Sequence, residues 1–115
     1  MHNYKELKVW KKAMELAKAI YILMREMPSE EKYGLTSQIK RSVISIPSNI
    51  AEGAGRKTKR DFAKYLSIAV GSLYELETQI QLSFDLELVD ENKEIFDNII
   101  EVQKMLHGLV NSLDT

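Results

Sequence analysis

Four stretches of this chain carry apolar residues at alternating spacings of three and four, and this repeat limits the fold more than any other feature. One stretch shows the repeat along its whole length, at Phe62, Leu66, Ala69, Leu73, Leu76 and Ile80. Such spacings place side chains on one face of an α-helix, because the helix turns once every 3.6 residues. Each stretch therefore predicts a helix with one buried face.

The repeats predict helices over about residues 5–27, 34–54, 58–87 and 91–112. No stretch alternates apolar and polar residues as a half-buried strand does. The expected connections are short, so consecutive helices should be antiparallel neighbours. We predict an all-α protein, an antiparallel up-down-up-down four-helix bundle, and the length of 115 residues fits one domain covering residues 1–115.

The first predicted helix has an unusually wide apolar face. One stripe comprises Leu7, Trp10, Met14, Ala17, Tyr21 and Met24, and a second comprises Val9, Ala13, Leu16, Ile20, Leu23 and Met27. Two adjacent stripes are typical of a helix in a bundle core rather than of one in a narrow dimer seam.

Prolines, glycines and polar capping residues set the expected helix ends. Pro28 should end the first helix, because proline has no N–H and its ring clashes with the preceding turn. The second helix should end around Glu52–Gly55, where glycine can take the left-handed conformation that closes a helix. Thr58 should cap the third helix, and Asp90 should cap the fourth.

Pro47 lies inside the second predicted helix and removes the hydrogen bond to the carbonyl of Val43. The apolar stripe passes through this position in phase, which predicts a kinked but continuous helix. Nearby polar side chains, such as those of Ser45 and Asn49, would then supply partners for the freed groups. The alternative is two short helices.

The composition excludes several classes of protein. The chain has no cysteine, so it has no disulfide framework and no thiolate metal site. Its first residues are charged, unlike a secretory signal. No uncharged apolar run approaches the ~20 residues that span a bilayer. We expect a cytoplasmic protein that does not contact a membrane.

No constellation of residues indicates catalysis or a cofactor. The segment GAGRKT resembles the end of a phosphate-binding loop, but Arg56 replaces the required lysine and Ile50 replaces the first glycine. Neither His2 nor His107 belongs to the Glu-x-x-His pair that a di-metal bundle needs. We therefore expect no enzyme activity, no metal and no other cofactor.

Charge is distributed very unevenly along the chain. Residues 1–64 hold 14 Lys and Arg against 7 Asp and Glu, whereas residues 65–115 hold 2 against 10. The candidate nucleic-acid-binding residues are Lys40, Arg41, Arg56, Lys57, Lys59, Arg60 and Lys64. With no aromatic residue interleaved, contact should be with the phosphate backbone of RNA or DNA and weakly sequence-specific. The alternatives are a solvated loop, or two halves that neutralise each other.

A polar stripe accompanies the apolar stripe of the second predicted helix. It comprises Ser42, Ser45, Asn49 and Glu52, and small residues follow one flank of the third helix at Ser67, Gly71 and Thr78. Solvent exposure with capping of the kink is one interpretation, and a subunit interface or a polar network between the central helices is the other. Gly71 costs a helix ~1 kcal/mol relative to alanine, which close backbone packing would offset.

The segment SIPSNIAEGAGR, preceded by GLTSQIKR and followed by FAKYLSIAVGSLYELETQI, resembles the four-helix bundle family named after the intervening-sequence protein of bacterial 23S ribosomal RNA. LKVWKKAMELAKAIY is similar to the family's first helix, so the likeness runs from about Tyr4 to Val110. The matching motif positions look mostly architectural. They are Arg41, Ser45, Pro47, Asn49, Glu52, Gly53, Arg56, Gly71, Ser72 and Glu75.

That family is similar to the accessory variability protein of diversity-generating retroelements. The resemblance implies a homopentamer with an electropositive surface that binds nucleic acid and partners a reverse transcriptase. We expect a non-enzymatic, homo-oligomeric adaptor, and the alternative is a protein-interaction module that binds no nucleic acid. Two departures are Ser42, where alanine is frequent, and the acidic FDLELVDEN at residues 84–92. The second departure confines the expected contact to the corner between the second and third helices.

Overall fold

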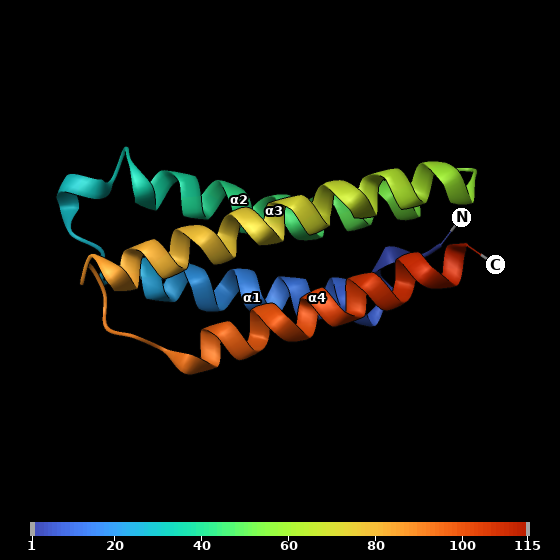
Figure 1. The fold of residues 1–115 in the computed structure, drawn as a ribbon. Coiled ribbons are helices and arrows are strands. Elements are labelled where there is room, and N and C mark those ends of the chain that lie inside the picture. The colour runs from blue at the N-terminus through green and yellow to red at the C-terminus, as the bar shows by residue number, and fades with distance from the viewer. Residues whose placement is uncertain (1, 115) are drawn as a thin grey trace.

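The computed structural model describes residues 2–114, which contain four α-helices and no strand (Figure 1). The helices are α1 (Lys8–Met24), α2 (Leu35–Ala54), α3 (Lys59–Asp85) and α4 (Lys93–Leu113). Two 3-10 turns, η1 (Tyr4–Glu6) and η2 (Ser29–Glu31), lie on either side of α1. The all-α prediction is confirmed.

Each helix packs against the next one along the chain, and α4 returns to pack against α1. Figure 1 shows the chain reversing direction at each connection, in an up-down-up-down order. Two hydrogen bonds between α2 and α3 agree with this, because Ser42 bonds to Gln79 whereas the later Ser45 bonds to the earlier Ser72. The predicted four-helix bundle is therefore the observed arrangement.

The predicted apolar stripes form the core. All six residues of the α3 stripe are at most 3% exposed, and burial of each large side chain contributes roughly 1.5–3 kcal/mol. The two stripes of α1 differ from each other. Val9, Leu16 and Ile20 are buried, whereas Trp10 and Met14 are only half-buried and Tyr21 is exposed. The wide face of α1 is therefore only partly used by the core.

Several helix ends differ from the prediction. α1 ends at Met24, and the segment to Gly34 contains η2 instead of a short loop. α2 ends at Ala54, within the predicted range, but its C-cap Gly55 has φ −83° and no glycine of the described residues is left-handed. Thr58 caps α3 as predicted, since its Oγ1 accepts the N–H of Asp61 at 3.1 Å. The cap of α4 is Asn92 and not Asp90, because the Asn92 Oδ1 accepts the N–H of Ile95 at 3.4 Å.

The last turn of α3 closes on a residue in the left-handed conformation. Glu87 has φ 57°, and its N–H bonds to the Phe84 carbonyl at 3.0 Å while the N–H of Leu88 bonds to the Ser83 carbonyl at 2.9 Å. This pattern is the Schellman motif, which usually has glycine at this position because a Cβ is crowded there. α3 consequently ends at Asp85, two residues before the predicted end.

Replacing Glu87 by glycine is expected to stabilise the protein. The Glu87→Gly variant should gain about 1 kcal/mol of unfolding free energy, because glycine adopts this conformation without the Cβ contact. Urea unfolding followed by circular dichroism measures the change. Glu87→Ala is the matched control, since it removes the same charge but keeps the Cβ. A glycine variant no more stable than the alanine variant would contradict the assignment.

α2 and α3 lie very close together at Gly53. A Cβ at this position would lie 2.7 Å from the Tyr65 Cβ and 3.0 Å from the Phe62 Cδ1. Real Cβ atoms do not come this close, so only glycine allows the first turns of α3 to lie against the end of α2. This contact fixes the geometry of the corner between the two helices.

The Gly53→Ala variant should therefore lose about 1–3 kcal/mol of stability, the usual cost of overpacking a close contact. Gly108→Ala serves as its control, because a Cβ there meets nothing within 4 Å and the exposed helical site should gain about 0.5–1 kcal/mol. Thermal or urea unfolding measures both. Equal effects of the two substitutions would show that the close approach at Gly53 is not what restricts the position.

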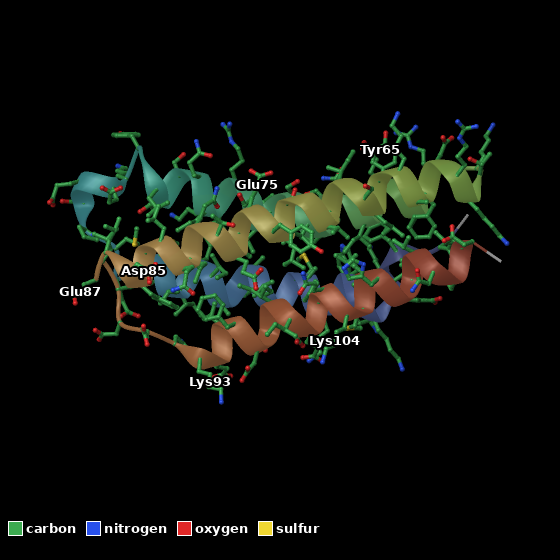
Figure 2. The ribbon with its side chains drawn as sticks, in the orientation of Figure 1. Tyr65, Glu75, Asp85, Glu87, Lys93 and Lys104 are labelled. Atoms are coloured by element: carbon green, nitrogen blue, oxygen red, sulfur yellow. The ribbon has the colours of Figure 1, made fainter. Side chains whose placement is uncertain are left out.

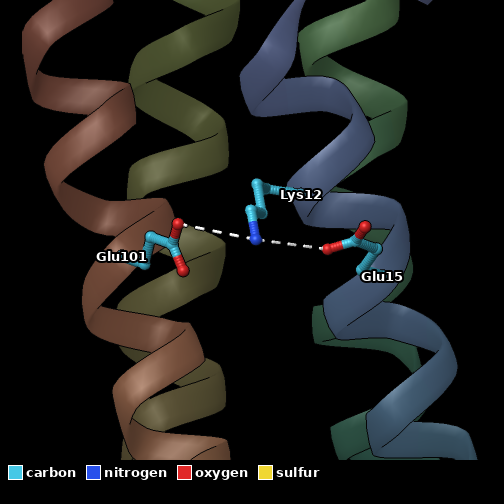
Figure 3. Close-up of polar contacts among 3 residues, drawn as sticks. All are labelled: Lys12, Glu15 and Glu101. Carbon is cyan, nitrogen blue, oxygen red and sulfur yellow. Dashed lines mark ion pairs between the residues drawn. The ribbon is translucent and has the colours of Figure 1, made fainter.

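Lys12 links α1 to α4 across the bundle surface. Its Nζ lies 3.5 Å from the Glu101 Oε1 and 3.4 Å from the Glu15 Oε2 (Figure 3). These carboxylates, Glu101 first and then Glu15, raise the pKa of Lys12 above its ordinary value of 10.5. Because the pKa of Lys12 is higher in the folded protein, its two ion pairs stabilise the fold fully at pH values below 10.5. This stabilisation is lost as the pH rises through the raised pKa of Lys12.

Glu101→Gln should lower the melting temperature slightly at neutral pH and low salt. The effect should shrink in concentrated salt, which screens exposed charges, and disappear once Lys12 loses its proton at alkaline pH. Asp97→Asn is the control, because it makes the same charge change at an exposed site on α4 that has no ion pair within 4.0 Å among residues 2–114. An effect of Glu101→Gln that is independent of salt and pH would exclude the ionic origin.

Candidate nucleic-acid interface

Five cations surround the connection from α2 to α3. We call this cluster the basic corner, and it consists of Arg56, Lys57, Lys59, Arg60 and Lys64. All five residues are exposed. They lie where α2 ends and the first turns of α3 begin, at the end of the bundle that also holds both ends of the chain (Figure 1). The N-terminal segment packs there, since the N–H of His2 bonds to the Ala54 carbonyl at 2.8 Å.

The charges of the basic corner are largely unneutralised. In residues 2–114, only Arg56 among the five has a carboxylate within 4.0 Å, the Glu52 Oε1 at 3.9 Å. The helix-capping side chain of Thr58 satisfies one N–H of the first turn of α3, and the free N–H groups of such a turn add positive potential. An anion that approaches the corner therefore meets exposed positive charge.

Neutralisation between the two halves of the chain is also limited. Of the ion pairs within residues 2–114, only Lys12–Glu101 joins residues 1–64 to residues 65–115. The other two, Lys12–Glu15 and Arg56–Glu52, lie within the first half. Packing of the two halves leaves the charge segregation of the sequence on the surface.

Tyr65 holds the side chain of Arg56. The Arg56 Nη2 donates to the Tyr65 hydroxyl at 2.6 Å, and the guanidinium carbon lies 4.7 Å from the centre of the Tyr65 ring. Figure 2 shows Tyr65 at the corner end of α3, far from Asp85 and Glu87 at the other end. No aromatic residue was expected at this cluster, because Tyr65 follows the last cation in sequence and reaches Arg56 only when the turn brings α3 back along α2. The sequence did contain one sign of an aromatic residue at the cluster, since Tyr65 directly follows Lys64.

Lys40 and Arg41 do not join the basic corner. Arg41 precedes Arg56 by fifteen residues, which is roughly 22 Å along a helix that rises 1.5 Å per residue. Lys40 instead lies over α1, with its Nζ 5.0 Å from the centre of the Tyr21 ring. The seven predicted nucleic-acid-binding residues therefore fall into two separate sites.

The polar stripe of α2 bonds to α3 beside the core. The Ser42 Oγ donates to the Gln79 Oε1 at 2.9 Å, and the Oγ atoms of Ser45 and Ser72 lie 2.8 Å apart. Asn49 Nδ2 donates to both the carbonyl and the Oγ of Ser45. Of the two interpretations of this stripe, the polar network between the central helices is present.

Pro47 lies within α2, which continues from Leu35 to Ala54, so the predicted continuity is confirmed while the kink stays a prediction. From the sequence, the side chains of Ser45 and Asn49 were expected to supply partners for the groups that Pro47 frees. Instead, the Ser45 hydroxyl bonds to Ser72, and the Asn49 amide bonds to Ser45. The proline itself is buried, and it lines a surface hollow beside Trp10 of α1.

The remaining motif positions have different surroundings. Glu75 is exposed on α3, as Figure 2 shows. A Cβ at Gly71 would meet nothing within 4 Å, so the close packing expected at Gly71 does not occur within the described part of the chain. Gly53, by contrast, is required by the contact with Tyr65.

His107 lies at the surface with its Nε2 3.4 Å from the Tyr74 hydroxyl. Within residues 2–114, no three His, Asp or Glu side chains are grouped so that they could hold a metal ion. No helix there has the length and apolarity needed to cross a bilayer.

The chain is thus a small four-helix bundle. Its central helices, α2 and α3, are joined by side-chain hydrogen bonds and by a short connection rich in Lys and Arg. The chain belongs to the 23S rRNA-intervening sequence protein family, whose model matches residues 5–108. The crystal structure of a protein with unknown function from the S23 ribosomal protein family of Bacteroides thetaiotaomicron is similar, with a TM-score of 0.82 and 28% sequence identity. The match covers 89% of this chain and 97% of that one. No curated protein matches the chain.

Proposed function

We propose that this protein is a non-enzymatic adaptor that binds the backbone of RNA or DNA through the basic corner and acts as a homo-oligomer. One observation carries the proposal: Lys57, Lys59, Arg60 and Lys64 are exposed, and none has a carboxylate within 4.0 Å in the described part of the chain. Cations in this state attract phosphates and release bound counterions when they meet them. A cytoplasmic location, as expected from the sequence, fits this role.

The chemistry of the corner favours phosphate over bases. Arg56 is held by Tyr65, so its planar guanidinium loses little side-chain entropy when it forms paired hydrogen bonds with a phosphate. The lysines act as mobile point charges around it. Backbone contacts carry little sequence information, so structured RNAs of different sequence should bind with similar affinity.

Binding should depend steeply on salt. If all five cations engage phosphates, the affinity for a duplex should fall with a log–log slope of about −4 to −5. Fluorescence anisotropy with a labelled structured RNA measures this slope at low and moderate salt. The Lys57→Gln/Arg60→Gln double variant should weaken binding to all sequences and reduce the slope by about 2.

The matched control for that experiment is Lys40→Gln/Arg41→Gln. It makes the same change in charge on the same pair of residue types, but roughly 20 Å away along α2. We expect its slope to stay close to that of the wild type. Absence of RNA binding at low salt would end the proposal, as would equal losses in the corner and control variants.

The second candidate function is a protein-interaction module in which the same corner contacts an acidic partner. The observation that favours it is the unpaired charge of the same corner, because Lys57, Arg60 and Lys64 would attract the carboxylates of an acidic protein as well as phosphates. The resemblance noted above implies a reverse transcriptase as one such partner. Indifference to RNA, together with a protein that co-purifies through the corner cations, would support this alternative.

Self-association is part of the proposal and independent of nucleic acid. A Cβ at Gly71 would meet nothing within 4 Å among residues 2–114, and several apolar side chains remain outside the core. A second copy would cover such positions. The homopentamer implied by the resemblance stays a prediction.

A further inference from the structure

The end of the bundle opposite the basic corner is strongly acidic. The connections from α1 to α2 and from α3 to α4 both lie there (Figure 1), and Figure 2 shows Asp85 and Glu87 at this end of α3. Residues 26–34 and 85–94 together hold eight Asp and Glu against two Lys. None of these carboxylates has a cation within 4.0 Å among residues 2–114. We call these two stretches the acidic end.

The most exposed large hydrophobic side chains of the described residues also gather at this end of the bundle. Tyr33, in the connection from α1 to α2, is 88% exposed, Leu86 at the end of α3 is 58% exposed, and Ile22 near the end of α1 is 57% exposed. No other large hydrophobic side chain of residues 2–114 exceeds 46%. Exposed hydrophobic groups rimmed by charge are typical of a surface that binds another protein.

A hollow between α1 and α4 forms a groove at the acidic end. Its volume is about 220 Å³, and its apolar wall includes Ile22 and Leu23 of α1 and Ile95 of α4. Two acids, Glu26 and Glu94, also line it, both are exposed, and no cation is among its lining residues. The groove therefore combines an apolar wall with carboxylates that no cation of the described chain neutralises.

We propose that the acidic end binds a Lys- and Arg-rich segment of a different protein through this groove. An apolar side chain of that segment would contact Ile22, and neighbouring cations would pair with Glu26 and Glu94. Complementary charge of this kind speeds association and selects the partner. Nucleic acids and anionic lipid surfaces do not fit the acidic end, because their phosphates would meet like charge. The proposal is independent of nucleic-acid binding at the basic corner.

The basic corner of a second copy fits the acidic end less well than a foreign segment does. No large hydrophobic side chain between residues 45 and 67 is exposed, so the corner offers cations without an apolar group to enter the groove. The partner is therefore a protein in which cations alternate with exposed apolar residues. Such a partner would be held at one end of a bundle 44 Å long, with the basic corner free at the other end.

Fluorescence anisotropy with a synthetic peptide tests the proposal. The probe is a labelled peptide with leucine and lysine at helical spacing, and the wild-type protein should bind it at low salt without any RNA. Glu26→Gln/Glu94→Gln should weaken binding about tenfold, because two ion pairs are lost. Ile22→Ser should also weaken binding about tenfold, since it removes the apolar contact in the groove.

Three controls accompany these measurements. Glu6→Gln/Glu75→Gln removes two carboxylates from exposed sites outside the acidic end and should bind the peptide as the wild type does. Lys57→Gln/Arg60→Gln, which disables the basic corner, should also leave peptide binding unchanged. A second peptide with serine in place of every leucine keeps the charge, and it should bind the wild type at least about tenfold more weakly. Thermal melts followed by circular dichroism establish that every variant is folded.

The possible failures can be told apart. A wild-type protein that does not bind the leucine–lysine peptide at low salt would overturn the proposal, whether or not RNA binds. Equal losses in Glu26→Gln/Glu94→Gln and Glu6→Gln/Glu75→Gln would show attraction by net charge alone, and equal affinity for the two peptides would show that the groove is not used. Light scattering without peptide covers the remaining case. A smaller mass for Glu26→Gln/Glu94→Gln than for the wild type would identify a second copy as the occupant, which contradicts a foreign partner.

Discussion

The close approach of α2 and α3 at Gly53 is the constraint on which the rest of this structure depends. Without a side chain at Gly53, Phe62 and Tyr65 come against the end of α2, and the connection between the helices can be short. The same approach brings Ser42 and Ser45 within hydrogen-bonding distance of Gln79 and Ser72. It also places Tyr65 under the guanidinium of Arg56. The polar seam and the order within the basic corner are therefore two results of one contact.

The fold was largely predictable because it depends on burial. An apolar stripe such as Phe62–Ile80 is buried only when the segment is a helix with that face against a core. The sequence alone shows the stripe and therefore predicts the helix. Helix ends were less predictable, because neighbouring residues compete for the same role. Asp90 and Asn92 are both good capping residues, and Glu87 occupies a left-handed position where glycine is expected.

The candidate site was predictable in composition but not in arrangement. The sequence identifies which residues near the corner are cationic, because charge needs no knowledge of the fold. The contact of Arg56 with Tyr65 depends on which turn of α3 lies against Gly53. The apolar repeat of one helix does not show how that helix is aligned along its neighbour. The exposed stripe of α1 was missed for a related reason. A wide apolar face predicts burial, but not whether the chain itself or another copy provides it.

The even number of helices has a consequence for how this protein can be handled and attached. The chain ends on the side of the bundle where it starts, and the backbone of His2 is bonded to Ala54 beside the basic corner. A fluorophore joined to either terminus would report on events at that corner. A surface tether at either terminus would instead orient the molecule with the η2 turn outward and the cations facing the support.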